Sequence, residues 1–124
     1  MALEKPVVEP HDGDAPADLV IEDITVGEGE EAKPGQQVTV HYAGVSYSTG
    51  EEFDASWNRG APLDFRLGVG QVIADWDEGI VGMKVGGRRK LVIPANKAYG
   101  ERGAGGVIGP GEALVFVVDL MGVR

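Results

Sequence analysis

Few residues of this 124-residue chain have the types and spacing that covalent or metal chemistry requires. His11 and His41 are the only histidines, and no cysteine or acidic cluster accompanies them, so we expect no metal site. Three serines (46, 48 and 56), His41 and Asp54 supply the residue types of a catalytic triad. No strand-turn-helix nucleophile elbow is predicted, however, and these residues are expected at the solvated surface. The glycine-rich segment 103–106 lacks the Lys-Ser/Thr of a phosphate-binding loop. We therefore predict neither a metal nor a cofactor.

A second group of residues is apolar and mostly aromatic. Its members are Tyr42, Phe53, Leu63, Phe65, Trp76, Tyr99, Val107, Ile108 and Phe116. Taken singly, each is more typical of a core than of a site. Several lie at the ends of expected elements or in loops, where burial is difficult, and together they would form an apolar cup around a helix. Trp76 is then either ordinary core or the floor of that cup. Asp54 is either a lone carboxylate at the rim or a turn residue paired with Arg59.

One short helix is predicted in the middle of the chain. Apolar residues recur there at helical spacing between Gly70 and the Gly86–Gly87 pair. They are Val72, Ile73, Trp76, Ile80, Val81 and Met83.

The other periodic segments alternate as strands do, with turn residues between them. They cover residues 19–26, 38–47, 51–54, 63–67, 91–93 and 114–120. A change of phase at Glu22–Asp23 suggests a bulge in the first, and the apolar last strand suits the middle of a sheet. We predict an α+β fold in which a bent antiparallel sheet of five or six strands wraps around the one short helix.

Composition limits the classes of partner. Apolar residues make up 43% of the chain and charged residues 25%, as in ordinary globular domains. The net charge of -9 argues against nucleic acid and anionic membrane as partners. Residues 1–17 contain three prolines and no periodicity, so we predict a flexible acidic tail before a domain at 18–124. The absence of cysteine leaves the compartment open. Without an apolar span or a signal-peptide core, the expected location is the cytoplasm, and nothing in the sequence suggests more than a monomer.

With these residues in view, the chain resembles the FKBP-type peptidyl-prolyl cis-trans isomerases, in a small single-domain form. The likeness extends from Leu19 to Arg124. The matching segments are Val40–Gly44, Phe53–Ser56, Gly70–Ile73, Trp76 with Glu78 and Gly79, Gly82–Gly87, Ile93–Pro94, Ala98–Gly100 and Leu114–Phe116. So many motifs in the same order make the resemblance specific.

The resemblance implies a substrate pocket floored by Trp76. Its catalytic residues would be Tyr42, Phe53, Asp54, Trp76, Tyr99 and Phe116, and its substrate-binding residues Arg59, Leu63, Val72, Ile73, Val107 and Ile108. By the same likeness, the Ile73 amide and the Tyr99 hydroxyl hydrogen-bond the peptide. The implied ligands are proline-containing peptides, unfolded proteins, and macrolides such as rapamycin or tacrolimus.

The sequence departs from the family pattern in a few places. Leu63 replaces an aromatic residue, which thins one wall of the pocket, and Ala104 and Gly109 loosen the flap loop. Asp75 takes the place of a glycine. Trp57 is an unusual aromatic, expected to be exposed beside the pocket. Two functions stay open: an isomerase that assists protein folding, or a module that binds proline-containing segments or macrolides with incidental catalysis.

Overall fold

The computed structural model describes residues 19–47, 50, 52–70, 72, 74–94 and 113–123, and at positions 53, 59, 74 and 75 it describes the backbone alone. Within this part of the chain there are six strands and two short helices. The elements are β1 (Val20–Thr25), β2 (Gln37–Ser46), β3 (Glu52–Ala55), α1 (Ser56–Arg59), β4 (Leu63–Arg66), α2 (Ala74–Ile80), β5 (Arg88–Ile93) and β6 (Leu114–Val123). Neither helix is long enough to cross a membrane.

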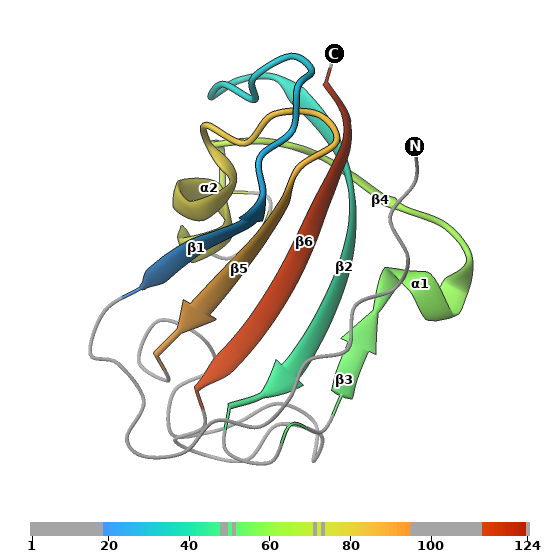
Figure 1. The fold of residues 1–124 in the computed structure, drawn as a ribbon, viewed down its shortest axis with the longest axis vertical. Helices are drawn as coiled ribbons and strands as arrows, with labels where there is room; N and C mark the ends of the chain where they lie inside the picture. The colour runs from blue at the N-terminus through green and yellow to red at the C-terminus, as the bar shows by residue number, and fades with distance from the viewer. Residues whose placement is uncertain are drawn as a thin grey trace.

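The strands form one antiparallel sheet in the order β1-β5-β6-β2-β3. The long strand β2 has two partners on its outer side: its first half pairs with β4 and its second half with β3. The sheet curves, and α2 lies against one of its faces (Figure 1). The predicted fold class is therefore confirmed, including β6 in the middle of the sheet. The bulge in β1 lies between Asp23 and Thr25, slightly later than the sequence pattern suggested.

The helices differ in detail from the prediction. The spacing of apolar residues extends from Val72 to Met83, but α2 covers only Ala74–Ile80. Val81 and Gly82 form a turn, and the Met83 amide donates to the Ile80 carbonyl. Val81 and Met83 therefore still pack with the main apolar cluster after the helix has ended. The additional helical turn α1 ends at Gly60, which adopts the left-handed conformation that closes helices (φ 68°).

The sheet buries apolar side chains on both faces. Successive residues of a strand point to opposite sides, so Phe116 and Val115 of β6 belong to two different clusters. The larger cluster lies between the sheet and α2 and includes Trp76 and Ile80 of the helix. The smaller one contains Val45, Tyr47, Val92, Ala113 and Val115.

An ion pair joins the neighbouring strands β5 and β6. Arg88 donates to both carboxylate oxygens of Asp119, from Nε at 2.6 Å and from a terminal nitrogen at 2.8 Å. Asp119 is 1% exposed. The hydrogen bond to Asp119 raises the pKa of the Arg88 guanidinium against the opposing effect of burial. The bidentate geometry satisfies a carboxylate that would be costly to bury alone.

The loop after β1 is tied closely to the turn between α2 and β5. Backbone hydrogen bonds join Gly29 and Glu30 to Val85, and Ala32 to Met83. Gly27 is buried at this contact, where a Cβ atom would stand 2.5 Å from the Lys84 carbonyl oxygen and 2.6 Å from the Gly87 nitrogen. The approach of these two backbones leaves no room for a side chain.

Gly27→Ala should therefore lower the free energy of unfolding by about 1–3 kcal/mol, because the backbone atoms it meets cannot move aside independently. The measurement is urea unfolding followed by tryptophan fluorescence. Gly122→Ala is the matched control, since a Cβ atom there meets nothing within 4 Å. Equal stability of the two variants would show that the Gly27 contact is not close.

Candidate functional site

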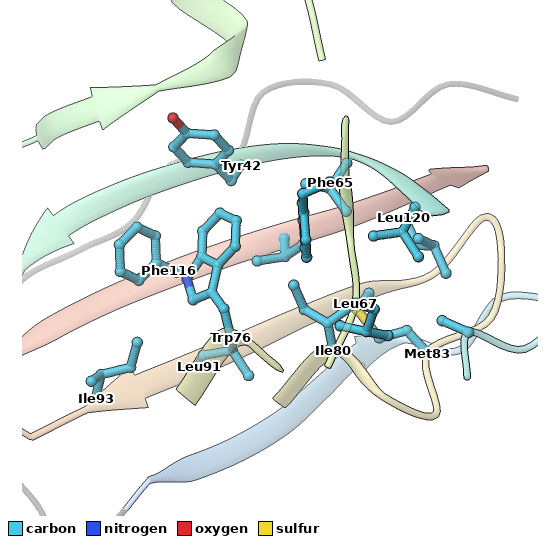
Figure 2. Packing of buried hydrophobic residues seen from close by; sticks show 14 of the residues in the cluster. Tyr42, Phe65, Leu67, Trp76, Ile80, Met83, Leu91, Ile93, Phe116 and Leu120 are labelled. Atoms are coloured by element: carbon cyan, nitrogen blue, oxygen red, sulfur yellow. The ribbon is translucent and has the colours of Figure 1, made fainter. Parts of the chain in front are cut away.

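Trp76 lies at the centre of an aromatic group contributed by three strands and a helix. Its ring is 5.1 Å from that of Tyr42 and 5.1 Å from that of Phe116, both in edge-to-face orientation. Phe65 of β4 is the third neighbour, at 5.9 Å. Figure 2 shows these rings converging between the helix and the concave face of the sheet. Edge-to-face pairs at such distances stabilise more than their buried area alone.

Each ring reaches this point because of its place in an element. Tyr42 and Phe116 are on neighbouring strands, where residues 42 and 44 of β2 stand opposite 118 and 116 of β6. Trp76 is on the first turn of α2, and α2 can approach the sheet closely because Gly79 faces Leu91 of β5. The helix therefore places the largest side chain of the core directly against the middle of the sheet.

Trp76 is 4% exposed, and its indole nitrogen is buried without an acceptor among the described residues. The predicted walls of the cup, Phe53, Ile73, Tyr99, Val107 and Ile108, lie outside the described side chains. Trp76 as a pocket floor therefore stays a prediction, as does the pocket itself.

Asp54 is exposed on β3 and interacts with one member of the aromatic group. Its carboxylate accepts a hydrogen bond of 2.6 Å from the Tyr42 hydroxyl. The structure thus brings together two predicted catalytic residues from neighbouring strands. The side chain of Arg59, the alternative partner of Asp54, is not among those described.

Two more of the predicted site residues have described side chains. Leu63 and Val72 are partly buried and pack against the main cluster, on the same side of the sheet as Trp76. Phe65 belongs to the apolar group predicted from the sequence, although not to the site residues that the resemblance implies, and it contacts Trp76. It alternates with Leu63 and with Leu67 just after β4, and residues two apart on a strand share a face.

Expectations about three residues were wrong. Ser46, expected at the surface, is buried at the end of β2. Ser56, expected at the surface, is fully buried, and its hydroxyl contacts both the amide (2.7 Å) and the carbonyl (3.3 Å) of Tyr42. Trp57, expected to be exposed, is half-buried and stacks on His41 at 4.2 Å. The cause is α1, because this unpredicted helical turn directs both side chains toward β2.

The Ser56 hydroxyl forms a third contact, with His41 Nδ1 at 2.9 Å. A hydroxyl has one hydrogen to donate, and Ser56 donates it to the Tyr42 carbonyl. The three contacts are satisfied together when His41 Nδ1 carries a hydrogen and donates it to Ser56. Ser56 therefore joins the start of α1 to the backbone on either side of the Tyr42 side chain.

The described residues of this site offer few groups that could carry out covalent or metal-dependent chemistry. The described residues include no group of three metal-binding side chains. The serine that contacts a histidine also donates to a backbone carbonyl and is fully buried, so it is not presented to a substrate. The chemical resources of the site are a buried cluster of aromatic side chains and an exposed carboxylate that accepts a hydrogen bond from one of them, Tyr42.

Comparisons with known proteins identify the family of the chain. Residues 28–121 match the model of the family "FKBP-type peptidyl-prolyl cis-trans isomerase". The chain is 64% identical over 124 residues to an FK506-binding protein of Streptomyces anulatus, covering 99% of this chain and 100% of that protein. It is 54% identical over 93 residues to the peptidyl-prolyl cis-trans isomerase FPR2 of Saccharomyces cerevisiae, covering 75% of this chain and 69% of that protein.

Two solved structures share the fold. The crystal structure of AtFKBP13 aligns with a TM-score of 0.79 and 43% identity, covering 89% of this chain and 96% of that one. The crystal structure of FkpA from Escherichia coli aligns with a TM-score of 0.75 and 45% identity, covering 86% of this chain and 48% of that one.

Ser56→Ala should lower the free energy of unfolding by about 1–3 kcal/mol, because the buried amide and carbonyl of Tyr42 lose their contacts with the Ser56 hydroxyl. Asn58→Ala is the matched control on the same helical turn. Its side-chain amide donates to Glu52 at the exposed surface (2.7 Å), and its loss should cost no more than about 0.5 kcal/mol. Urea unfolding measures both variants, and a Ser56→Ala protein as stable as the control would contradict the bridging role.

Proposed function

Because the chain belongs to the FKBP-type peptidyl-prolyl cis-trans isomerase family, we propose that it accelerates rotation about X-Pro bonds in an apolar aromatic pocket and so assists protein folding. The observation that carries the proposal is the convergence of Tyr42 and Phe116 on Trp76, with Asp54 at the edge. We further propose a monomeric, cytoplasmic protein.

The reaction suits such a site because it requires no nucleophile, metal or general base. The barrier to rotation about a peptide bond is about 18–20 kcal/mol and arises from amide resonance. In the twisted state the C–N bond loses double-bond character and the carbonyl loses charge separation. An apolar surrounding therefore favours the twisted amide over the planar one. A rate gain of roughly 10⁵ requires only about 7 kcal/mol, which desolvation, fixed contacts and one or two hydrogen bonds of about 1 kcal/mol each can supply.

The deciding experiment is the cis-trans isomerisation of a short Leu-Pro or Phe-Pro peptide, with and without rapamycin or tacrolimus. We expect catalysis that the macrolide suppresses. Several relatives are named "FK506-binding protein", which supports the choice of ligand. Macrolide binding without catalysis would favour the binding-module alternative, and neither activity would refute both functions.

Asp54→Asn should lower kcat/KM only partially, by about tenfold, which corresponds to about 1.4 kcal/mol. The reason is that the carboxylate acts electrostatically and the reaction transfers no proton. Tyr42→Phe is the matched variant that keeps the carboxylate but removes the hydroxyl that holds it. Complete loss of turnover in a folded Asp54→Asn protein would show that the carboxylate has a different role.

Phe53→Ala should lower kcat/KM more than Arg59→Ala, because the proposal assigns Phe53 to the wall against the proline ring. The same peptide assay ranks the two variants, with unfolding midpoints measured alongside to exclude a loss of fold. An equal or reversed ranking would argue against an apolar pocket as the source of catalysis.

A further inference from the structure

The outer face of the sheet, opposite the face that α2 covers, carries the smaller apolar cluster. Its valines form a row across three strands: Val92 of β5 stands opposite Val115 of β6, and Val115 stands opposite Val45 of β2. Residues that stand opposite one another in a sheet share a face, so all three point to the outer side. Ala43 and Val117 belong to the next row and are also buried. The centre of the outer face is therefore apolar and shielded from solvent.

This burial requires a cover above the sheet. A side chain in the middle of an open sheet face keeps its outer end in solvent, yet Val115 is 0% exposed. Tyr47, the largest member of the smaller cluster, is 9% exposed and so needs a cover itself. Another layer of the protein must therefore lie over this part of the face.

The described elements do not supply that layer. Helix α2 packs against the opposite face (Figure 1). The turn α1 reaches the outer face through Trp57, which stacks on His41, but His41 is four residues from Val45, about 13 Å along β2. The loop at 26–36 is hydrogen-bonded to the turn before β5, at the other end of that strand from Val92. Within the described part of the chain, no element is placed to cover the valine row.

Two long segments lie outside the described residues, 1–18 and 95–112. The proposed function assigns the second segment to the pocket beside Trp76, on the inner face of the sheet. Residues 1–18 are then the remaining candidate for the cover. The exclusion of residues 95–112 rests on the proposed function, so the experiment below tests both segments.

The length of residues 1–18 is sufficient for this role. The segment joins β1 at Val20, which stands opposite Val92 and extends the valine row to β1. Val8 is twelve residues before Val20, so an extended chain can carry it up to about 40 Å from that point. Val45, at the other end of the row, is three strand spacings away from β1, about 14 Å. The chain can therefore turn back over the sheet and still reach the cluster.

The prolines of the segment also suit a position on a sheet face. Backbone N–H and C=O groups in the middle of a sheet pair with the neighbouring strands, so the face offers few partners to a covering chain. Pro6 and Pro10 flank Val7 and Val8, and a proline has no N–H that needs a partner. An apolar pair between two prolines can therefore be buried there with few unsatisfied amides.

We propose that residues 1–18 dock on the outer face of the sheet and cover the smaller cluster, with Val7 and Val8 in contact with Val45 and Val115. The composition of the segment alone predicts a flexible tail. Docking instead makes it a part of the folded domain, and it increases the apolar area that a domain of this size can bury.

Methyl NMR of the whole chain, with labelled valine and isoleucine methyl groups, tests the placement. We expect nuclear Overhauser cross-peaks from Val7 and Val8 to Val45 and Val115. Cross-peaks to these two valines from residues 107 and 108, with none from Val7 or Val8, would assign the cover to residues 95–112 and refute the proposal. The absence of cross-peaks from both segments would refute it as well.

Stability provides a second test. The double variant Val7→Asp with Val8→Asp should lower the unfolding midpoint by about 5 °C or more, because two carboxylates would then face apolar side chains. The matched control is Val26→Asp with Val69→Asp, which makes the same change of charge at two exposed valines. The control should stay within about 2 °C of the wild type. Equal midpoints of the two double variants would contradict the docked segment.

Turnover separates this placement from the proposed function. Val7→Asp with Val8→Asp should leave the isomerisation of a short Leu-Pro peptide unchanged, because the smaller cluster and Trp76 lie on opposite faces. A folded double variant without turnover would place the segment at the pocket and refute the docking on the outer face. A protein that shows the expected cross-peaks but isomerises no peptide would refute the proposed function and retain the docked segment, so the two failures are distinguishable.

Discussion

The packing of Trp76 against the middle of the sheet is the contact on which the rest of the structure depends. A seven-residue helix is too short to be stable by itself, so tertiary contacts must hold α2 in place. Trp76 and Ile80 supply them by burying one side of the helix against β2, β5 and β6. Gly79 permits the close approach to Leu91, and Asp77 anchors the preceding loop by accepting from the Gly68 and Gly70 amides. The same contact forms the aromatic surface of the proposed pocket.

Three contacts hold Tyr42, in the second half of β2, in place. Tyr42 is held on its ring side by Trp76, at its hydroxyl by Asp54, and at its backbone by Ser56. These three contacts come from α2, β3 and α1, which are separate in the sequence. The aromatic group and the Asp54 carboxylate are consequently fixed relative to one another, as the proposed catalysis by positioning and desolvation requires.

The two edges of the sheet differ in the strands that form them. At one edge, β3 and β4 share the outer side of β2, and α1 packs beside β2. At the other edge, β1 pairs with β5, and all six of its residues are exposed. The aromatic group lies between these edges, on the face of the sheet that α2 covers.

The sequence alone determined the fold class, the strands, the place of the helix and the aromatic set, because these depend on local periodicity and turn chemistry. It also suggested Asp54 as a site residue, which stays a prediction. It missed α1, since Ser56, Trp57 and Asn58 have no helical periodicity and a four-residue helix depends on its neighbours. The burial of Ser56, the stacking of Trp57 on His41 and the Tyr42–Asp54 hydrogen bond were decided only by the tertiary structure. They join residues of β2 to residues twelve to sixteen positions away, and such contacts follow from strand pairing and not from any local pattern.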